Sequence, residues 1–139
     1  MTSETIVIDT DPGQDDAVAL LLAFASPELD LRAITTVAGN VPLALTTANA
    51  LRVRELAGRE DVPIHAGADR PLLFPLSTTE FVCGPDGLAG ADLPPPRGTA
   101  SLSSSVAGAS MPISSSHAVL MNRRRRSPSL STAIIFGSV

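Results

Sequence analysis

The chain has 139 residues, a length that suits one domain, and 44% of them are hydrophobic, enough for a core that is mostly aliphatic. Its single cysteine, Cys83, excludes an internal disulfide bond and is typical of a reducing compartment. The apolar runs are too short to span a membrane, and acidic residues near the N-terminus argue against a signal peptide. We therefore expect a cytoplasmic protein with no membrane partner.

The net charge of −4 is unevenly divided along the chain. Residues 1–96 contain all 14 acidic residues and five arginines, whereas residues 97–139 contain the other five arginines and no acidic residue. Apolar runs alternate with turns before this point, and serines without a helical or strand period follow it. We therefore expect an α/β domain over 1–96 and a separate Ser/Arg-rich segment over 97–139.

The first predicted elements are a strand over Thr5–Asp9 and a helix over Asp16–Ala25. The strand is rich in β-branched residues, and the helix contains an apolar run that predicts a buried element. Between them, Pro12-Gly13 favours a turn, because proline fixes φ and glycine tolerates many conformations. Ser26-Pro27 ends the helix. Together these elements form a strand, an acidic turn and a helix.

The turn contains four carboxylates within eight positions, namely Asp9, Asp11, Asp15 and Asp16. Such close like charges repel unless a cation or hydrogen-bond donors compensate them. Capping of the helix N-terminus by Asp15 is one explanation, and it leaves the strand-side Asp9 and Asp11 unexplained. A hard divalent cation such as Ca²⁺ or Mg²⁺ explains all four carboxylates, so we expect a metal site here.

Three further elements follow: a strand over Leu31–Val37, a helix from Pro42 to Gly58 and a short strand over Val62–His65. They predict a βαβαβ unit of an open, mostly parallel sheet with helices on its faces. Right-handed crossovers place the carboxyl ends of these strands at one edge of the sheet. The acidic turn, Asn40 and Asp69 should gather at that edge, where ligands bind in such sheets.

Two other residues are candidates for this edge. Asn40 follows the second strand, and its position suits either a loop start or a polar side chain aimed into the cleft. Cys83 lies in the glycine-containing segment 81–90, which could close over a cleft. A free cysteine is equally often a small buried apolar residue, so both alternatives stay open.

The stretch IVIDTDPGQDDAVALLLA, with ITTVAGN at 34–40 and VPIHAGADRPL at 62–72, resembles the start of the inosine–uridine-preferring nucleoside hydrolases. Members of that family carry the motif D-x-D-P-G-x-D-D after their first strand. The resemblance covers about residues 4–96, and family members are much longer. We therefore expect only the N-terminal part of such a domain in this chain.

The resemblance implies hydrolysis of the N-glycosidic bond of ribonucleosides at one bound Ca²⁺, giving ribose and a free base. It makes Asp11 both metal ligand and general base, and Asp16 a second metal ligand. It also implies that Asp9 supports the metal site and that Asp15 and Asn40 bind the sugar.

The resemblance also bears on base recognition and assembly. Cys83 stands where many members carry a histidine near the leaving base, although some members carry cysteine there. Cys83 is therefore a candidate substrate-binding residue. Full-length relatives are expected to form homo-oligomers.

Residues 97–139 match no motif of the family. Arg123–Arg126 could form a nucleic-acid patch, but without aromatic residues to stack bases we expect no nucleic-acid partner. Two interpretations of the segment remain: a solvated, disordered tail, or out-of-frame translation of a gene for the rest of the hydrolase.

Two alternatives to a working hydrolase remain as well. A Mg²⁺-dependent phosphatase of the haloacid dehalogenase type also has a D-x-D motif after its first strand. That motif calls for Thr or Val where this chain has Gly13, and it does not require Asp15-Asp16. The second alternative is a non-catalytic, metal-binding fragment, and we expect the 139-residue chain by itself to be weakly active or inactive.

Overall fold

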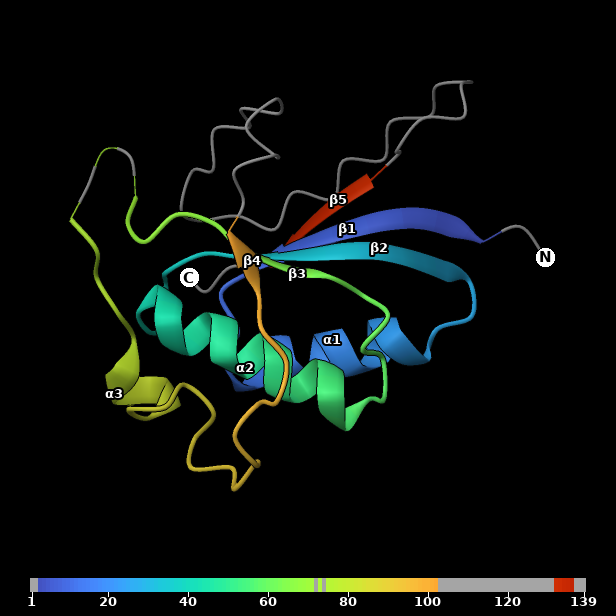
Figure 1. Ribbon diagram of the computed structural model, residues 1–139. Coiled ribbons are helices and arrows are strands. Elements are labelled where there is room, and N and C mark those ends of the chain that lie inside the picture. The colour runs from blue at the N-terminus through green and yellow to red at the C-terminus, as the bar shows by residue number, and fades with distance from the viewer. Residues whose placement is uncertain (1–2, 72, 74, 103–131, 137–139) are drawn as a thin grey trace.

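The computed structural model describes residues 3–71, 73, 75–102 and 132–136 (Figure 1). Within these ranges five strands and three helices follow one another along the chain. Their bounds are β1 (Glu4–Thr10), α1 (Gln14–Ala25), β2 (Leu29–Thr36), α2 (Leu43–Leu56), β3 (Ile64–Ala66), α3 (Glu80–Cys83), β4 (Ser101–Leu102) and β5 (Thr132–Phe136). No helix within the described ranges has the length and apolar character needed to cross a membrane.

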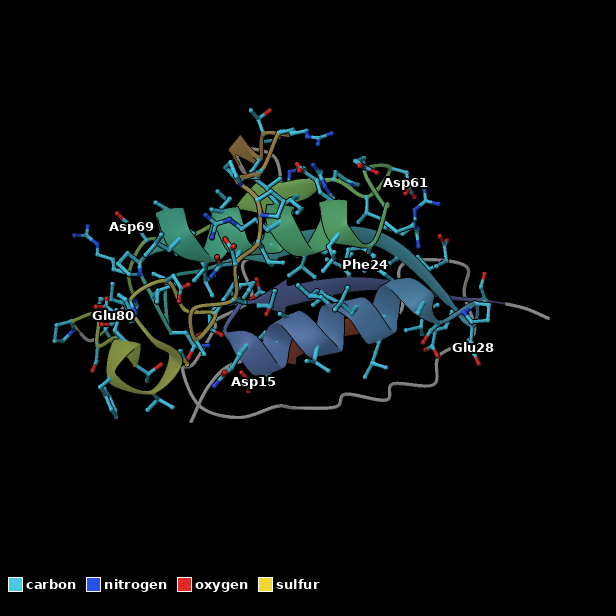
Figure 2. The ribbon with its side chains drawn as sticks, turned by 90° about the horizontal axis from the view of Figure 1, so that it is seen from below. Asp15, Phe24, Glu28, Asp61, Asp69 and Glu80 are labelled. Atoms are coloured by element: carbon cyan, nitrogen blue, oxygen red, sulfur yellow. The ribbon has the colours of Figure 1, made fainter. Side chains whose placement is uncertain are left out.

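The strands form one sheet in the order β4-β3-β2-β1-β5, and each neighbouring pair is parallel. This confirms the predicted α/β fold with an open parallel sheet. The two longer helices, α1 and α2, lie side by side on the same face of the sheet (Figures 1 and 2). They share a face because β1, β2 and β3 are added in one direction, and right-handed crossovers then fall on the same side.

The core lies between the sheet and these two helices. It is formed by strand residues with branched side chains and by one face of each helix, and it is aliphatic apart from one phenylalanine. Its members are Ile6, Ile8, Leu31, Ile34 and Ile64 from the strands, Leu20, Ala23 and Phe24 from α1, Ala50, Leu51 and Val53 from α2, and Val62.

The two helices differ from what the sequence predicted. Helix α1 was expected to be buried, but Val18 and Leu22 on its outer side are 57% and 64% exposed. Helix α2 has no clean apolar period because three of its buried residues, Thr46, Asn49 and Arg54, are polar or charged. The Thr46 hydroxyl and the Asn49 amide donate hydrogen bonds to backbone carbonyl groups. These polar groups therefore keep partners although they are buried.

The sheet continues beyond residue 96. The backbone N–H of Arg97 is shared between the two carboxylate oxygens of Glu55 on α2 (2.9 and 3.0 Å), and one of these oxygens also accepts from the N–H of Gly98 (2.7 Å). Strand β4 then pairs with β3, and β5 pairs with β1 from Ile6–Thr132 to Thr10–Phe136. The predicted disorder of the Ser/Arg-rich segment stays a prediction for 103–131 and 137–139, which lie outside the described residues.

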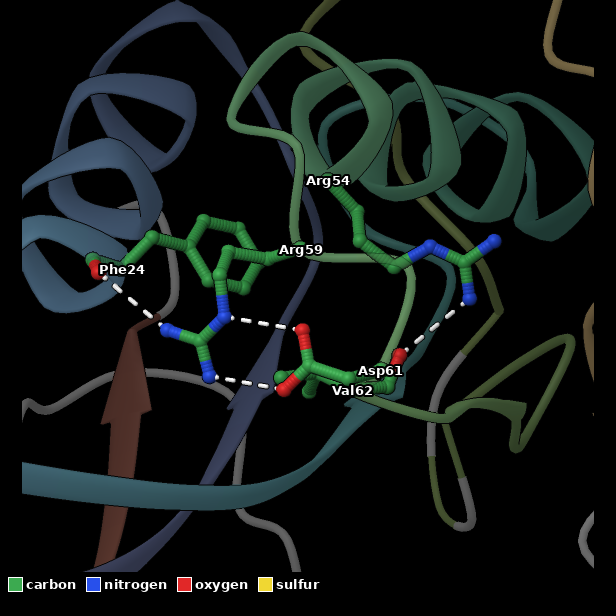
Figure 3. Close-up of polar contacts among 5 residues, drawn as sticks. All are labelled: Phe24, Arg54, Arg59, Asp61 and Val62. Atoms are coloured by element: carbon green, nitrogen blue, oxygen red, sulfur yellow. Dashed lines mark hydrogen bonds and ion pairs between the residues drawn. The ribbon is translucent and has the colours of Figure 1, made fainter.

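A polar cluster around Arg59 joins α1 to the loop between α2 and β3 (Figure 3). The Arg59 guanidinium donates two hydrogen bonds of 2.9 Å to the Asp61 carboxylate and one of 3.3 Å to the backbone carbonyl of Phe24. It also lies 5.8 Å from the centre of the Phe24 ring. A cation at the last turn of α1 is favourable because the carbonyl groups there carry partial negative charge.

We expect Arg59→Ala to lower the free energy of unfolding by about 1–2 kcal/mol, since it removes the bond to Phe24 and the cation–π contact. Urea denaturation followed by circular dichroism measures this loss. The matched control is Arg32→Ala, whose ion pair with Asp30 is exposed and 3.5 Å long; its effect should stay within about 0.5 kcal/mol. Equal losses in the two variants would show that the contacts of Arg59 with Phe24 do not stabilise the fold.

Candidate functional site

The carboxyl ends of β1 and β2 bring Asp11, Asp16 and Asn40 together. The backbone N–H of Asn40 donates to Asp11 Oδ2 at 2.8 Å. The side-chain Nδ2 of Asn40 donates to the backbone carbonyl of Asp11 at 2.9 Å and to Asp16 Oδ2 at 3.3 Å. Three residues predicted for one site, from two separate loops, therefore lie in direct contact.

Asp16 also stabilises the start of α1. Its Oδ2 accepts a hydrogen bond of 3.1 Å from the backbone N–H of Gly13, which is the N-cap residue. This bond satisfies a backbone donor at the start of the helix. Asp15, to which the capping hypothesis gave this role, is exposed at the surface. The cap therefore gives a structural role to one carboxylate oxygen of Asp16. The carboxylate of Asp15 remains exposed to solvent or a ligand.

Two glycines allow the loops to approach this closely. A Cβ atom on Gly39 would lie 2.0 Å from Asp11 Oδ2, and one on Gly13 would lie 2.8 Å from Asn40 Nδ2. Neither distance is possible for a real side chain. Glycine is therefore required at both positions by the contacts between the acidic turn and the loop after β2.

Burial of these carboxylates makes ionisation costly. The pKa of Asp11 is raised to about 6, mainly because burial disfavours the charged form, and the negative charge of Asp16 adds to the rise. Burial also raises the pKa of Asp16. Asp11 Oδ1 is buried and has no hydrogen-bond partner in the described part of the chain. The site thus holds excess negative charge and an unsatisfied carboxylate oxygen.

Asp9 and Asp69 lie apart from these contacts. Asp9 accepts a hydrogen bond from the hydroxyl of Thr35 on β2, and burial raises its pKa. Its predicted support of a metal site stays a prediction. Asp69 is exposed, at the same end of the molecule as Asp15 (Figure 2).

Cys83 is buried at 5% exposure and faces Asn40. Its thiol lies 3.6 Å from Asn40 Oδ1 and 3.8 Å from the Thr79 hydroxyl. The neighbouring Phe81 and Val82 are instead 87% and 60% exposed. Of the residues on α3, these two present apolar surface to solvent, and the role of Cys83 in substrate binding stays a prediction.

Sequence reasoning missed Thr79 and Asn49. The Thr79 hydroxyl donates to Asn40 Oδ1 at 2.7 Å. Asn49 is fully buried on α2 and its Nδ2 donates to the carbonyl groups of Pro12 (3.2 Å) and Asp86 (2.8 Å). No sequence signal marked Asn49, because the pattern of the helix left its buried face undefined. Nothing local marked Thr79, because its partner is 39 residues away.

The described residues offer part of a metal site. Within the ranges that the structure describes, no group of three or more His, Cys, Asp or Glu side chains is arranged to hold a metal ion. The unpartnered Asp11 Oδ1 and the raised pKa values of Asp11 and Asp16 nevertheless fit a divalent cation, which prefers carboxylate oxygens. The donor set is compatible with a metal and incomplete by itself.

The model of the family described as inosine-uridine preferring nucleoside hydrolase matches residues 6–137. The open parallel sheet and the acidic turn at its carboxyl edge agree with this match. The chain belongs to the inosine-uridine preferring nucleoside hydrolase family. This membership decides against the haloacid dehalogenase alternative.

Individual relatives agree with this assignment. The chain is 58% identical over 91 residues to an uncharacterised protein of Schizosaccharomyces pombe, covering 66% of this chain and 29% of that protein. It is 52% identical over 94 residues to the pyrimidine-specific ribonucleoside hydrolase RihA of Photobacterium profundum (68% and 30%). It is 47% identical over 95 residues to the probable uridine nucleosidase 2 of Arabidopsis thaliana (67% and 30%). The chain thus spans about 30% of the length of these relatives.

Solved structures show the same likeness. The plant nucleoside hydrolase PpNRh1 matches with a TM-score of 0.60 and 44% identity, over 69% of this chain and 32% of that one. The purine-preferring ribonucleoside hydrolase from Gardnerella vaginalis matches with a TM-score of 0.69 and 28% identity, over 76% and 34%. The described fold therefore corresponds to about a third of these enzymes.

We expect Asp11→Asn to stabilise the metal-free protein at pH 7. The side-chain amide of the variant still has an oxygen that accepts from the N–H of Asn40. It carries no charge, and burial disfavours the charged form of Asp11. The rise in the pKa of Asp11 to about 6 corresponds to a stability gain of about 1–3 kcal/mol for the variant.

The sign of the pH dependence follows from the raised pKa of Asp11. The folded state holds the proton of Asp11 more tightly than the unfolded state does. The ionised carboxylate therefore lowers the free energy of unfolding fully above about pH 6 and not at all below about pH 4. Thermal unfolding in a chelator from pH 4 to 7.5 should show the advantage of Asp11→Asn growing with pH. Asp15→Asn, at an exposed position, is the control. An advantage that is constant with pH would contradict the explanation.

Proposed function

We propose that the whole protein hydrolyses the N-glycosidic bond of ribonucleosides with the help of a bound divalent cation, releasing ribose and a free base. The observation that carries this proposal is the buried, unpartnered Asp11 Oδ1 beside Asp16 at the carboxyl edge of the sheet. A carboxylate oxygen that is desolvated without a donor suits a cation, since an isolated buried charge is otherwise costly. Membership of the family supplies the reaction class.

Asp11 and Asp16 would hold the cation, with Asp9 in support. Carboxylate oxygens suit Ca²⁺ and Mg²⁺ alike, and Ca²⁺ is our choice because the family resemblance implies it. A bound divalent cation supplies a Lewis acid that makes water a better nucleophile near neutral pH. Asp11 would also accept the proton of the attacking water, as a carboxylate at the cation site can. The water oxygen would bond to the sugar carbon as the N-glycosidic bond breaks, and the base would leave with the electron pair of that bond and take up a proton.

The remaining predicted residues would act on the nucleoside. Asp15 is exposed beside the cluster and is suited to accept hydrogen bonds from ribose hydroxyl groups. Asn40 would contact the sugar only if its amide exchanged partners, because both amide hydrogens and the carbonyl oxygen already engage protein groups. We therefore assign Asn40 first to holding Asp11 and Asp16. Cys83 would lie near the base through its position on α3.

We expect the cation to bind with an affinity that depends on Asp11 and Asp16. Calorimetric titration with Ca²⁺ should show at least about tenfold weaker binding for Asp16→Asn than for the unmodified protein. Asp69→Asn is the matched control, because Asp69 is an exposed acidic residue at the same end of the molecule. Equal binding by Asp16→Asn and the unmodified protein would refute the metal assignment.

We propose that the 139-residue chain by itself is weakly active or inactive. Among the described residues, Asn40 holds two carboxylates, those of Asp11 and Asp16, whereas Ca²⁺ takes about six to eight oxygen ligands. Ribose release should be measured on uridine, cytidine, inosine and adenosine, because the similar proteins include pyrimidine-specific and purine-preferring enzymes. Turnover on the order of 1 s⁻¹ or more would contradict this proposal.

A chimera tests the site apart from the length of the chain. Residues 1–96 replace the 94 matching residues of the Photobacterium profundum enzyme, and the same four nucleosides are assayed. We expect activity that Asp11→Asn lowers by at least about a hundredfold, the usual effect of removing a positioned general base, while Asp69→Asn leaves it unchanged. An active chimera that tolerates Asp11→Asn would exclude the proposed role of Asp11.

A further inference from the structure

The side-chain amide of Asn40 connects the acidic turn to α3. One end of the amide, Nδ2, donates to the carbonyl of Asp11 and to Asp16 Oδ2. The other end, Oδ1, accepts a hydrogen bond of 2.7 Å from the Thr79 hydroxyl and faces the Cys83 thiol at 3.6 Å. The Asn40 side chain is fully buried, so these contacts are made away from water.

The orientation of this amide matters for Asp16. If the amide turned by 180°, its oxygen would face two acceptors, the Asp11 carbonyl and the Asp16 carboxylate, and would lose both hydrogen bonds. A donor at the opposite end strengthens the native orientation, because hydrogen bonds in a chain polarise one another. The Thr79 hydroxyl is such a donor. Valine has the same shape but no hydroxyl, so it could not donate this hydrogen bond.

The backbone around Thr79 is held to the same loop. The Thr79 N–H donates to the carbonyl of Asn40 at 2.9 Å, and the Thr79 carbonyl accepts from the N–H of Cys83 at 3.1 Å. Asn49 provides a second bridge, because it binds Pro12 in the acidic turn and Asp86 beyond α3. The Thr79 hydroxyl therefore sits in a fixed place relative to Asn40.

We propose that Thr79 is a positioning residue for Asp11 and Asp16, acting through the amide of Asn40, and that the conformation of α3 thereby sets the cation affinity of the acidic turn. The effect of Thr79 on cation affinity rests on the proposed function. The effect of Thr79 on the orientation of the Asn40 amide is independent of it. Thr79 lies outside the D-x-D-P-G-x-D-D motif, yet its hydroxyl donates to the amide that binds the backbone carbonyl of Asp11 and the carboxylate of Asp16.

The first experiment examines the amide in the metal-free protein by NMR. Selective ¹⁵N labelling of asparagine allows hydrogen exchange of the Asn40 side-chain NH₂ to be followed. Thr79→Val, which keeps the shape of the side chain, should accelerate that exchange about fivefold to tenfold, the value of one ordinary hydrogen bond. Thr79→Ser, which keeps the hydroxyl, should restore slow exchange.

Each outcome of this experiment decides the amide part. Slow exchange in the unmodified protein, with acceleration in Thr79→Val and rescue in Thr79→Ser, supports it. Unprotected Asn40 hydrogens in the unmodified protein would overturn it, and this needs no variant that must fold. Equal acceleration in both variants would also overturn it, because packing of the Thr79 methyl group would then be responsible.

The second experiment measures Ca²⁺ affinity by calorimetry on the same proteins. We expect Thr79→Val to weaken binding by about tenfold or more, as outer hydrogen bonds to metal ligands commonly do, and Thr79→Ser to bind as tightly as the unmodified protein. Unchanged affinity in Thr79→Val would overturn the coupling to the cation. If the unmodified protein takes up no Ca²⁺, the metal assignment fails, and the exchange rates still decide the role of Thr79.

Discussion

Three hydrogen bonds from Asn40 to the acidic turn are the constraint on which the carboxyl edge of this sheet depends. They join the loop after β2 to the loop after β1 and hold two buried carboxylates whose charges repel. Asn40 can do this because its backbone N–H and its amide point to the same two residues. The glycines at 13 and 39 follow from the same constraint, since a side chain at either position would occupy the space of these contacts.

The acidic turn places a cost on the fold that a structural role does not explain. A buried carboxylate oxygen without a donor and raised pKa values at Asp11 and Asp16 disfavour the charged, metal-free state. Other charged groups have close partners, as Arg59 has Asp61 and the carbonyl of Phe24. Buried carboxyl groups with shifted pKa values at one edge of a sheet are characteristic of a binding site.

Much of the fold was predictable because its signals are local. The branched residues of β1 and β2, the connection at Pro12-Gly13 and the positions of α1 and α2 each depend on neighbours in the sequence. The structure confirms these elements, with helix ends shifted by one or two residues. The pairing of β5 with β1 was not predictable, because it joins residues more than a hundred positions apart. The burial of Asn49 on α2 was missed for a similar reason, since its partners lie in loops that only the fold brings near.

The sequence by itself determined the family, the parallel α/β architecture and the presence of an acidic turn, because residue types at fixed short spacings specify all three. The tertiary structure decided which atoms meet. It assigned the helix cap to Asp16, placed Asp9 against Thr35, turned Cys83 towards Asn40 and brought Thr79 to the same amide. These contacts join residues from different loops and strands, so their geometry depends on how the crossovers return the chain to one edge of the sheet.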